Sequence, residues 1–210
     1  MLPKPIEDLA EKFRLLPGIG YRGSLKMALD LLQMEADKFG EFQSALTSVR
    51  SEVKICSNCG FFASDSAINL CEICKSKSRK ANQICLVEKP TDVITIEKSQ
   101  VYKGYYHVLN NLISPLDNIF AEDTTIGDLL DRRIKDVLSR CGELELIVFF
   151  KPGFAGEATI AYIKEILTRK NQLNIVKISR LAQGLPMYYN PDTLDQATMA
   201  KALEDRKEVS

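Results

Sequence analysis

The sequence contains no tryptophan, and its 210 residues include only one histidine, His107. It also lacks internal repeats, low-complexity tracts and any apolar run near the roughly 18 residues that span a bilayer. The first residues mix charge with short apolar stretches, unlike a secretory signal. We therefore expect a cytoplasmic protein. With no second histidine and no reactive serine motif, we expect His107 to have a core or surface role and not a catalytic one.

An excess of charge of either sign is absent as well, because 28 Lys and Arg residues balance 28 Asp and Glu residues. This balance argues against a general nucleic-acid coat, although local basic patches remain compatible with it. Hydrophobic residues make up 45% of the chain, which is enough to bury a core. The length suits one large domain or two to three small ones.

Two patterns of apolar residues divide the chain. Up to residue 53 the apolar positions have helical spacing, which predicts helices over 5–16, 22–32 and 38–53. From residue 83 onward short apolar runs alternate with helical segments, which predicts a parallel α/β sheet. The predicted strands are 84–87, 105–109, 144–150 and 175–179, and the predicted helices are 91–99, 125–140, 157–169 and 195–206.

Four of the six cysteines form two CxxC pairs, Cys56 with Cys59 and Cys71 with Cys74. Each pair can present two thiolates on one side of a tight turn, and two pairs complete a tetrahedral zinc site. All four positions are then occupied by protein ligands, so the site is structural. Such an ion would hold together a module of about twenty residues that is too small to bury its own core.

Two alternatives for these cysteines remain open, namely four reduced core thiols and an iron site with the same ligands. The loop between the pairs is slightly shorter than in a usual zinc ribbon but long enough for a small hairpin. Outside the cluster, Cys85 in a predicted strand is most simply a small buried hydrophobe, and Cys141 receives no role.

Leu16-Pro17-Gly18-Ile19-Gly20 separates the first two predicted helices. The glycines permit a backbone path that brings successive N–H groups to the surface at a helix start, where a phosphate oxygen can bind. Arg22 and Lys26, four residues apart, share a face of the following helix and can contact neighbouring phosphates. The pattern predicts a DNA-binding hairpin at Gly18, Gly20, Arg22 and Lys26, and a plain helical turn is the alternative.

Polar residues follow the first three predicted strands, where parallel strands share one edge. Glu88 follows the first strand, Asn110-Asn111 the second, and the loop 151–157 the third. We expect Glu88 and Glu157 to lie near one another. A magnesium-dependent site needs several converging carboxylates, whereas this loop offers only Glu157, so catalysis is not expected here.

Taken in order, these segments resemble the RecR family of recombination mediators along essentially the whole chain. The matching stretches are LPGIGYRGSLKMALDLL at 16–32, the cysteine pairs at 56–74, ICLVEKPTDV at 84–93, YHVLNNLISPLD at 106–117, GEATIAY at 156–162 and AQGLP at 182–186. The resemblance implies an α+β protein of several modules. These are a helix–hairpin–helix region (1–54), a four-cysteine zinc finger (55–78), a Toprim domain with a parallel sheet (79–178) and a C-terminal arm used for oligomerisation (179–210).

The same resemblance implies a function. Family members bind DNA without sequence preference as ring-like tetramers built from exchanged end segments, and they are not enzymes. They act at the nucleoid with RecO, and in some bacteria RecF, to load RecA onto single-stranded or gapped DNA. By this analogy Arg22 and Lys26 contact DNA, and the acidic Toprim edge at Glu88 and Glu157 faces RecO.

The sequence departs from the family pattern at several positions. Gly23 and Ser24 replace a small polar residue and an alanine, and Ala155 replaces an acid. Tyr188-Tyr189 and Asn110-Asn111 replace glycines. These changes indicate a divergent member whose arm packing or partner contacts differ.

Two other functions stay open on the sequence alone. A magnesium-dependent Toprim nuclease, primase or topoisomerase shares the sheet, but such enzymes need an acidic pair after the third strand, where this chain has Phe150-Lys151-Pro152-Gly153. A zinc-stapled adaptor that binds only proteins predicts no affinity for DNA.

Overall fold

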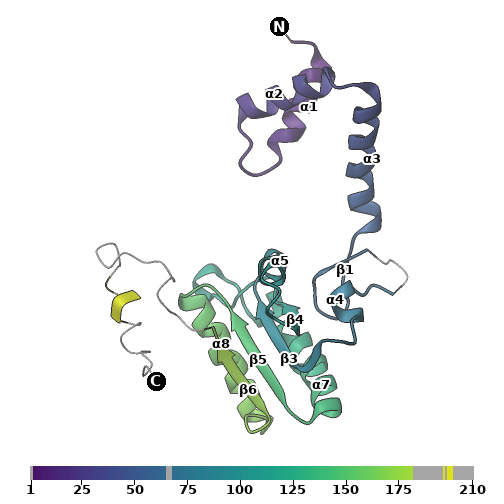
Figure 1. Ribbon diagram of the computed structural model, residues 1–210. Coiled ribbons are helices and arrows are strands. Elements are labelled where there is room, and N and C mark those ends of the chain that lie inside the picture. Colours follow the sequence, from purple (N-terminus) through teal and green to yellow (C-terminus); the bar gives the residue numbers. More distant parts are fainter. Residues whose placement is uncertain (1, 65–67, 182–195, 197, 201–210) are drawn as a thin grey trace. The chain divides into compact units, whose positions relative to one another are not determined.

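The computed structural model describes residues 2–64, 68–181, 196 and 198–200 (Figure 1). The chain divides into two units, Met1–Val53 and Lys54–Ser210, and each is treated by itself. The AQGLP segment, Tyr188, Tyr189 and most of the predicted last helix lie outside the described residues. Among the described helices, none combines the length and apolarity needed to cross a membrane.

The first unit contains three helices, α1 (Lys4–Arg14), α2 (Tyr21–Leu32) and α3 (Ala36–Glu52). All three begin and end within two residues of the predicted bounds, which is the usual uncertainty at helix ends. Small side chains form the buried contact between α1 and α2, since Ala10, Ser24 and Ala28 are its buried residues. By contrast, α3 has no buried residue within the unit.

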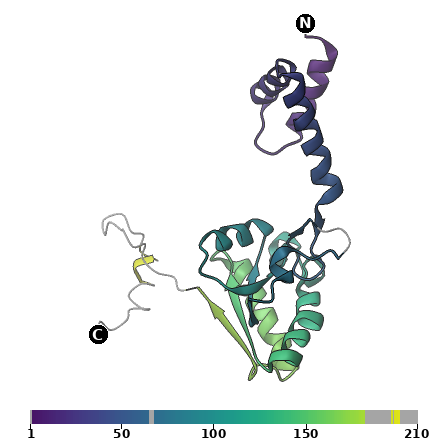
Figure 2. The ribbon, with the colours of Figure 1, turned by 45° about the vertical axis from the view of Figure 1, so that its right-hand side comes forward.

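The second unit is built on a four-stranded parallel sheet with the order β4-β3-β5-β6. Its strands are β3 (Lys80–Val87), β4 (Gly104–Val108), β5 (Leu144–Phe149) and β6 (Val176–Arg180). The main crossover helices are α5 (Pro90–Lys98), α7 (Ile134–Cys141) and α8 (Phe154–Arg169). Figures 1 and 2 show the helices on both sides of the strands, so the predicted α/β domain with a parallel sheet is confirmed.

Alternation along the strands gives the sheet two apolar faces. In β5, Leu144, Leu146 and Val148 are buried against the side that α7 and α8 cover. Ile147 and Phe149 point to the opposite side, where α5 packs. Both faces are therefore covered at least in part, as expected for a parallel sheet.

The segment predicted as one helix over 125–140 contains a π-helical turn. It runs through α6 (Ile126–Asp128), the π-helix η3 (Leu129–Arg133) and α7. A π turn shifts the register of the side chains that follow it, and such turns often occur at functional positions. Here it leaves the charged residue Arg133 only 3% exposed, inside the unit.

The loop after β4 is held by local polar contacts. It includes the 3-10 turns η1 (Pro115–Asp117) and η2 (Ala121–Asp123). The Thr159 hydroxyl in α8 accepts a hydrogen bond from the Ile113 N–H at 2.8 Å, which joins the GEATIAY segment to the YHVLNNLISPLD segment. Asn110 has a φ of 66°, a left-handed conformation that asparagine tolerates, so it can stand where the family has glycine.

Two element boundaries differ from the predicted ones by three residues or more. The helix α8 begins at Phe154, three residues earlier than predicted, because Gly153 caps it with a φ of 153° that favours glycine. The strand β3 begins at Lys80, four residues before the predicted start. Its first four residues carry little apolar signal, and their pairing is set by neighbouring strands.

His107 lies in β4 and is almost fully buried. Its Nε2 is 3.0 Å from the Thr125 hydroxyl and 3.2 Å from the Thr125 carbonyl oxygen. The Thr125 hydroxyl donates to the Val108 carbonyl, so we assign the proton of the neutral ring to Nε2. Burial lowers the pKa of His107 to about 4, and the nearby Arg133 acts in the same direction. The residue is a neutral part of the core.

We predict that this histidine makes the second unit sensitive to mild acid. The unfolded chain has a histidine pKa of about 6.5 and the folded chain about 4, so the unfolded state binds more protons between these values. The stability that His107 contributes is complete above the higher value and is lost as the pH falls towards the lower one. His107→Gln should therefore lose less stability in urea unfolding between about pH 7.5 and about pH 5. Equal losses in variant and wild type would contradict this assignment.

Candidate metal centre and nucleic-acid interface

The two cysteine knuckles are formed by short local elements. The hairpin of β1 (Lys54–Ile55) and β2 (Phe62–Ala63) encloses the first knuckle, and the second lies at the start of α4 (Glu72–Lys75). This pairing brackets Cys56 and Cys59. The Gly60 N–H donates to the Cys56 carbonyl at 2.9 Å, which closes the first turn.

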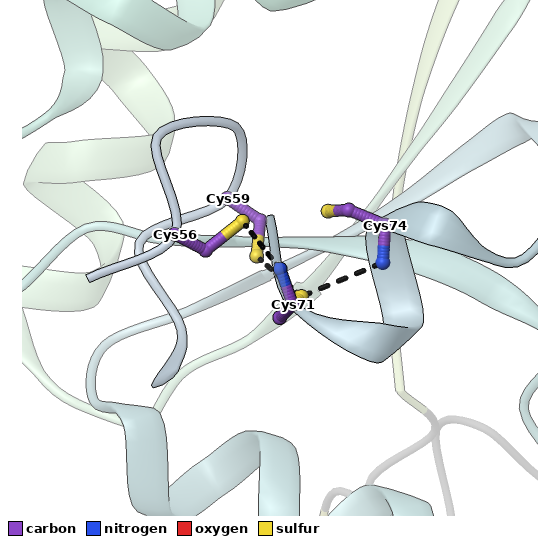
Figure 3. Close-up of side chains that lie close together, drawn as sticks. All are labelled: Cys56, Cys59, Cys71 and Cys74. Carbon is purple, nitrogen blue, oxygen red and sulfur yellow. Dashed lines mark hydrogen bonds between the residues drawn. The ribbon is translucent and has the colours of Figure 1, made fainter. Parts of the chain in front are cut away.

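All four sulfur atoms converge (Figure 3). The ligand atoms of Cys56, Cys59, Cys71 and Cys74 lie within 4.8 Å of one another, and three of the four residues are buried. The backbone N–H of Cys71 donates to the Cys56 sulfur, and that of Cys74 donates to the Cys71 sulfur, each at 3.4 Å. In a tetrahedral zinc site the sulfur atoms are about 3.8 Å apart, so the cluster fits a metal ion with a small contraction.

The electrostatics of the cluster favour a bound cation. Hydrogen bonds from the other cysteines, Cys59 first, lower the pKa of the Cys56 thiol. The contact with Cys56, together with Cys71 and Cys74, raises the pKa of Cys59. Four thiols this close therefore cannot all ionise by themselves, whereas a divalent ion stabilises four thiolates together.

The first knuckle is attached to the edge of the main sheet. The Val108 N–H in β4 donates to the Cys59 carbonyl at 2.8 Å. Gly60, with a φ of 79°, lies so close that an added Cβ would be 3.1 Å from the Val108 Cβ. Because β4 is an edge strand, this contact covers backbone groups that would otherwise be open to another chain.

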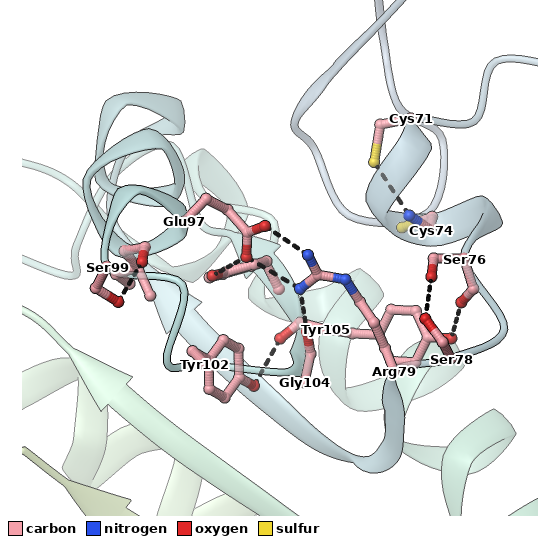
Figure 4. A network of polar contacts seen from close by, with 12 residues as sticks. Cys71, Cys74, Ser76, Ser78, Arg79, Glu97, Ser99, Tyr102, Gly104 and Tyr105 are labelled. Atoms are coloured by element: carbon pink, nitrogen blue, oxygen red, sulfur yellow. Dashed lines mark hydrogen bonds and ion pairs between the residues drawn. The ribbon is translucent and has the colours of Figure 1, made fainter.

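The second knuckle is attached through a polar network (Figure 4). The Arg79 guanidinium donates to both carboxylate oxygens of Glu97 and to the Gly104 carbonyl. Tyr106 also donates to Glu97, and the Tyr105 hydroxyl donates to the Ser76 carbonyl at 2.7 Å. Burial alone would raise the pKa of Glu97, but the hydrogen bonds from Arg79 and Tyr106 lower it. The carboxylate therefore stays ionised and links the knuckle to α5.

The hairpin between α1 and α2 presents an open helix start. Gly18 has a φ of 82°, and Gly20 is the N-cap of α2 without a side-chain cap. A Cβ at either glycine would meet nothing within 4 Å. The first turn of α2 carries no acid, and Arg22 and Lys26 are exposed. The backbone N–H groups and two cations are thus available to an anion.

The departures at Gly23 and Ser24 are compatible with this hairpin. Ser24 is fully buried, and its hydroxyl donates to the Tyr21 carbonyl at 2.9 Å, so it can occupy an alanine position without an unpaired group. A Cβ on Gly23 would meet only the Ile19 side chain at 3.9 Å, an ordinary contact.

The proposed acidic edge at Glu88 and Glu157 offers less evidence for a binding site than the cysteine cluster or the hairpin does. Val87 is the register partner of Phe149, so β3 and β5 end level with one another, before Glu88 and the loop to α8. Glu88 forms a 3.6 Å ion pair with Lys89. Two hydrogen bonds from Arg180 hold the pKa of Glu157 below its usual range. Within the described ranges, no group of three or more acids or histidines gathers at this edge.

The two remaining cysteines differ in burial. Cys85 is buried in β3, and burial raises the pKa of its thiol to about 12, which makes it a core residue as predicted. Cys141 is half-buried at the end of α7. Sequence reasoning missed the arginines at 79, 132 and 133, because their partners lie far away in the chain and no local spacing reveals them.

The chain combines three features: a helix–hairpin–helix with exposed cations, a four-cysteine cluster able to hold a metal ion, and a parallel Toprim-type sheet. Together they define a class of DNA repair and recombination proteins. Two family profiles match the chain, "RecR, helix-hairpin-helix" over residues 6–50 and "Toprim domain" over residues 82–182. The recombination protein RecR of Staphylococcus aureus, in the strains JH9, Newman and USA300, is 38% identical over 207 residues, which cover 99% of this chain and 98% of each relative. The chain belongs to the RecR family.

We predict that Cys59→Ala yields poorly soluble protein without bound metal, because the loss of one ligand opens the knuckle that contacts β4. Metal content by elemental analysis and the soluble fraction after expression measure the effect. Cys141→Ala is the matched control, since it removes a half-buried thiol outside the cluster and should behave as the wild type. Full solubility and unchanged thermal stability of Cys59→Ala would refute the role of the cluster.

Proposed function

We propose that this chain is a recombinational repair mediator that binds DNA without cutting or joining it. It acts in the cytoplasm, at the nucleoid, as a ring-like homotetramer. With RecO, and with RecF where a host has it, it helps to load RecA onto single-stranded or gapped DNA. Membership of the RecR family supports this role.

The observation that carries the DNA-binding proposal is the cationic hairpin. Arg22 and Lys26 are exposed and have no carboxylate partner among the described residues. The uncapped start of α2 adds backbone N–H groups and the positive end of a helix dipole. Contacts of this kind bind phosphates and do not distinguish bases, so we propose binding without sequence preference.

We propose zinc as the metal at the four cysteines. Four thiolates favour zinc or an iron centre, and a closed set of four protein ligands is typical of structural zinc. The attachment of both knuckles to the Toprim sheet supports a structural role. The ion would fix the knuckles and supply no reaction step.

The exposed apolar residues along α3 support the proposal of an oligomer. Apolar residues recur at the spacing of a coiled-coil seam, and all are exposed within the unit. They are Phe39, Phe42, Leu46, Val49 and Val53. An exposed seam of this kind suits a second copy of the chain, which would cover it.

A second surface supports a role for the C-terminal arm. An apolar groove of about 450 Å³ lies beside α5, and Tyr102, Phe149 and Leu181 contribute to its lining. Leu181 belongs to the proposed arm and is the last residue that the structure describes before position 196. We propose that the module boundaries are 1–54, 55–78, 79–178 and 179–210, with the last segment used in assembly.

We propose that RecO contacts the acidic edge of the Toprim sheet. Glu88 is half-buried, and Glu157 is already paired with Arg180. A basic partner would therefore have to displace Arg180 to engage Glu157. Glu88 is paired only with the neighbouring Lys89 at 3.6 Å, so a partner has a weaker contact to displace there, although the Glu88 side chain is less exposed than that of Glu157.

We predict that Arg22→Ala with Lys26→Ala weakens binding to single-stranded and gapped DNA alike. Each chain loses two phosphate contacts, so the slope of log affinity against log salt should fall by about 2 for each hairpin that touches DNA. Fluorescence anisotropy with labelled oligonucleotides of several sequences gives both quantities.

Lys98→Ala with Lys164→Ala is the matched control, because it removes the same charge from exposed helix positions in the other unit. The control should bind as the wild type does. Unchanged affinity of the hairpin variant would remove the hairpin from the account, and no DNA binding by the wild type at low salt would favour the protein adaptor.

The enzymatic alternative predicts a different result. A Toprim nuclease or topoisomerase would nick or relax supercoiled plasmid when magnesium is added. The described residues lack a converging acid cluster at the sheet edge, so we predict intact plasmid over the whole magnesium titration. Nicking that co-purifies with the chain and depends on Glu88 would overturn the proposal.

A further inference from the structure

Arg133 is the buried cation for which the structure offers no acidic partner. It is 3% exposed, and its Nη1 donates to the Asn58 side-chain oxygen at 2.8 Å. Its Nη2 lies 3.5 Å from the Tyr106 carbonyl, and its Nε has no hydrogen-bond partner. No ion pair joins Arg133 to a carboxylate within the described part of the chain.

Other arginines of this unit have carboxylate partners. Arg79 is paired with Glu97, and Arg132 with Asp128. The exposed arginines at 140, 169 and 180 pair with Asp136, Glu165 and Glu157. Among the arginines of this unit that the structure describes, the most buried is thus the one without a counter-charge. An isolated buried charge is strongly unfavourable, so a negative charge should lie nearby.

The neighbours of Arg133 point to the source of that charge. His107 is neutral, because burial and the arginine itself lower its pKa. Asn58 is also neutral, but it lies between the ligands Cys56 and Cys59 in the first knuckle. A divalent ion bound to four thiolates carries a net charge of about −2, which can balance a buried guanidinium.

We propose that Arg133 is a positioning residue for the metal centre, with the metal–thiolate charge as its counter-charge. This inference rests on the proposed metal site. Asn58 connects the guanidinium to the knuckle, and the π turn of η3 directs Arg133 inward. Arg132 supports the same knuckle, since it donates to Asn58 Oδ1 and to the carbonyls of Ser57 and Asn58. Its own charge is already balanced by Asp128.

The proposal couples the metal to the Toprim sheet. With the ion bound, Arg133 stabilises the thiolates and holds the knuckle against β4. Without the ion, Arg133 is a buried cation that lacks a compensating charge among the described residues. The arginine should therefore slow metal release and make the stability of the sheet depend on the metal.

Metal release from the full-length chain tests the first consequence. Zinc-loaded protein is mixed with a chromogenic chelator, and the release rate is compared between wild type, Arg133→Met and Arg133→Lys. Outer-shell partners typically change metal affinity by about 10- to 100-fold, so we expect release from Arg133→Met to be faster by about this factor. Arg133→Lys keeps the charge and should lie between the two.

Two control variants separate the effect of the Arg133 charge from the effect of losing hydrogen bonds to the knuckle. Arg140→Met removes an exposed arginine from α7, the helix that follows η3, and should release zinc at the wild-type rate. Arg132→Met breaks bonds to the same knuckle but removes a charge that Asp128 already balances, so its effect should be smaller than that of Arg133→Met. An equal or larger effect of Arg132→Met would overturn the charge argument.

A comparison of metal-loaded and chelated protein distinguishes this role from simple packing. We expect Arg133→Met to lower the urea midpoint of the zinc-loaded chain and to change that of the metal-free chain less, or to raise it. Equal shifts in both forms would show that Arg133 only fills space, which contradicts the proposal.

If Arg133→Met does not fold, Asn58→Ala gives the answer, because it removes the bridging oxygen of a half-buried residue and keeps both arginines. Because Asn58 Oδ1 also accepts from Arg132, this variant is compared with Arg132→Met. Zinc release faster than from Arg132→Met supports the proposal, and release at the rate of Arg132→Met or of the wild type overturns it. Wild-type protein that binds no metal refutes the metal site itself, whereas bound metal with unchanged release refutes only the role of Arg133.

Discussion

The structure of the second unit depends on the mutual proximity of four thiols. Sulfur atoms within 4.8 Å cannot all be ionised without a cation, and a module of about twenty residues cannot bury its own core. A metal ion resolves both constraints together. The first knuckle then covers part of the edge strand β4 through the hydrogen bond from Val108 to Cys59.

The two knuckles are joined to the sheet by different chemistry. The second uses Arg79 and Glu97, a charge pair that is complete within the protein. The first uses Arg133, whose charge is complete only if the metal centre supplies the opposite sign. The unit therefore combines one attachment that is independent of the metal with one that depends on it, whereas the proposed DNA-binding hairpin belongs to the other unit.

Local signals in the sequence predict most of the fold and part of the site. Helical spacing gives α1 to α3 within two residues, apolar runs give the four strands of the parallel sheet, and CxxC spacing gives the four-cysteine cluster. Long-range pairings are beyond this reasoning. The extension of β3 to Lys80 is set by adjacent strands, and the pairing of Glu157 with Arg180 joins residues 23 positions apart. The π turn that buries Arg133 likewise leaves no mark in residue periodicity.

Native mass spectrometry of the purified full-length chain tests the central claim most directly, since it reports metal content and assembly in one measurement. The account predicts one zinc ion per chain, and therefore four ions in the proposed tetramer. A zinc-bearing monomer or dimer would keep the metal centre and contradict the stable ring. A chain without metal would contradict the account, because the four thiols, the covered sheet edge and the buried Arg133 would all lack their common partner.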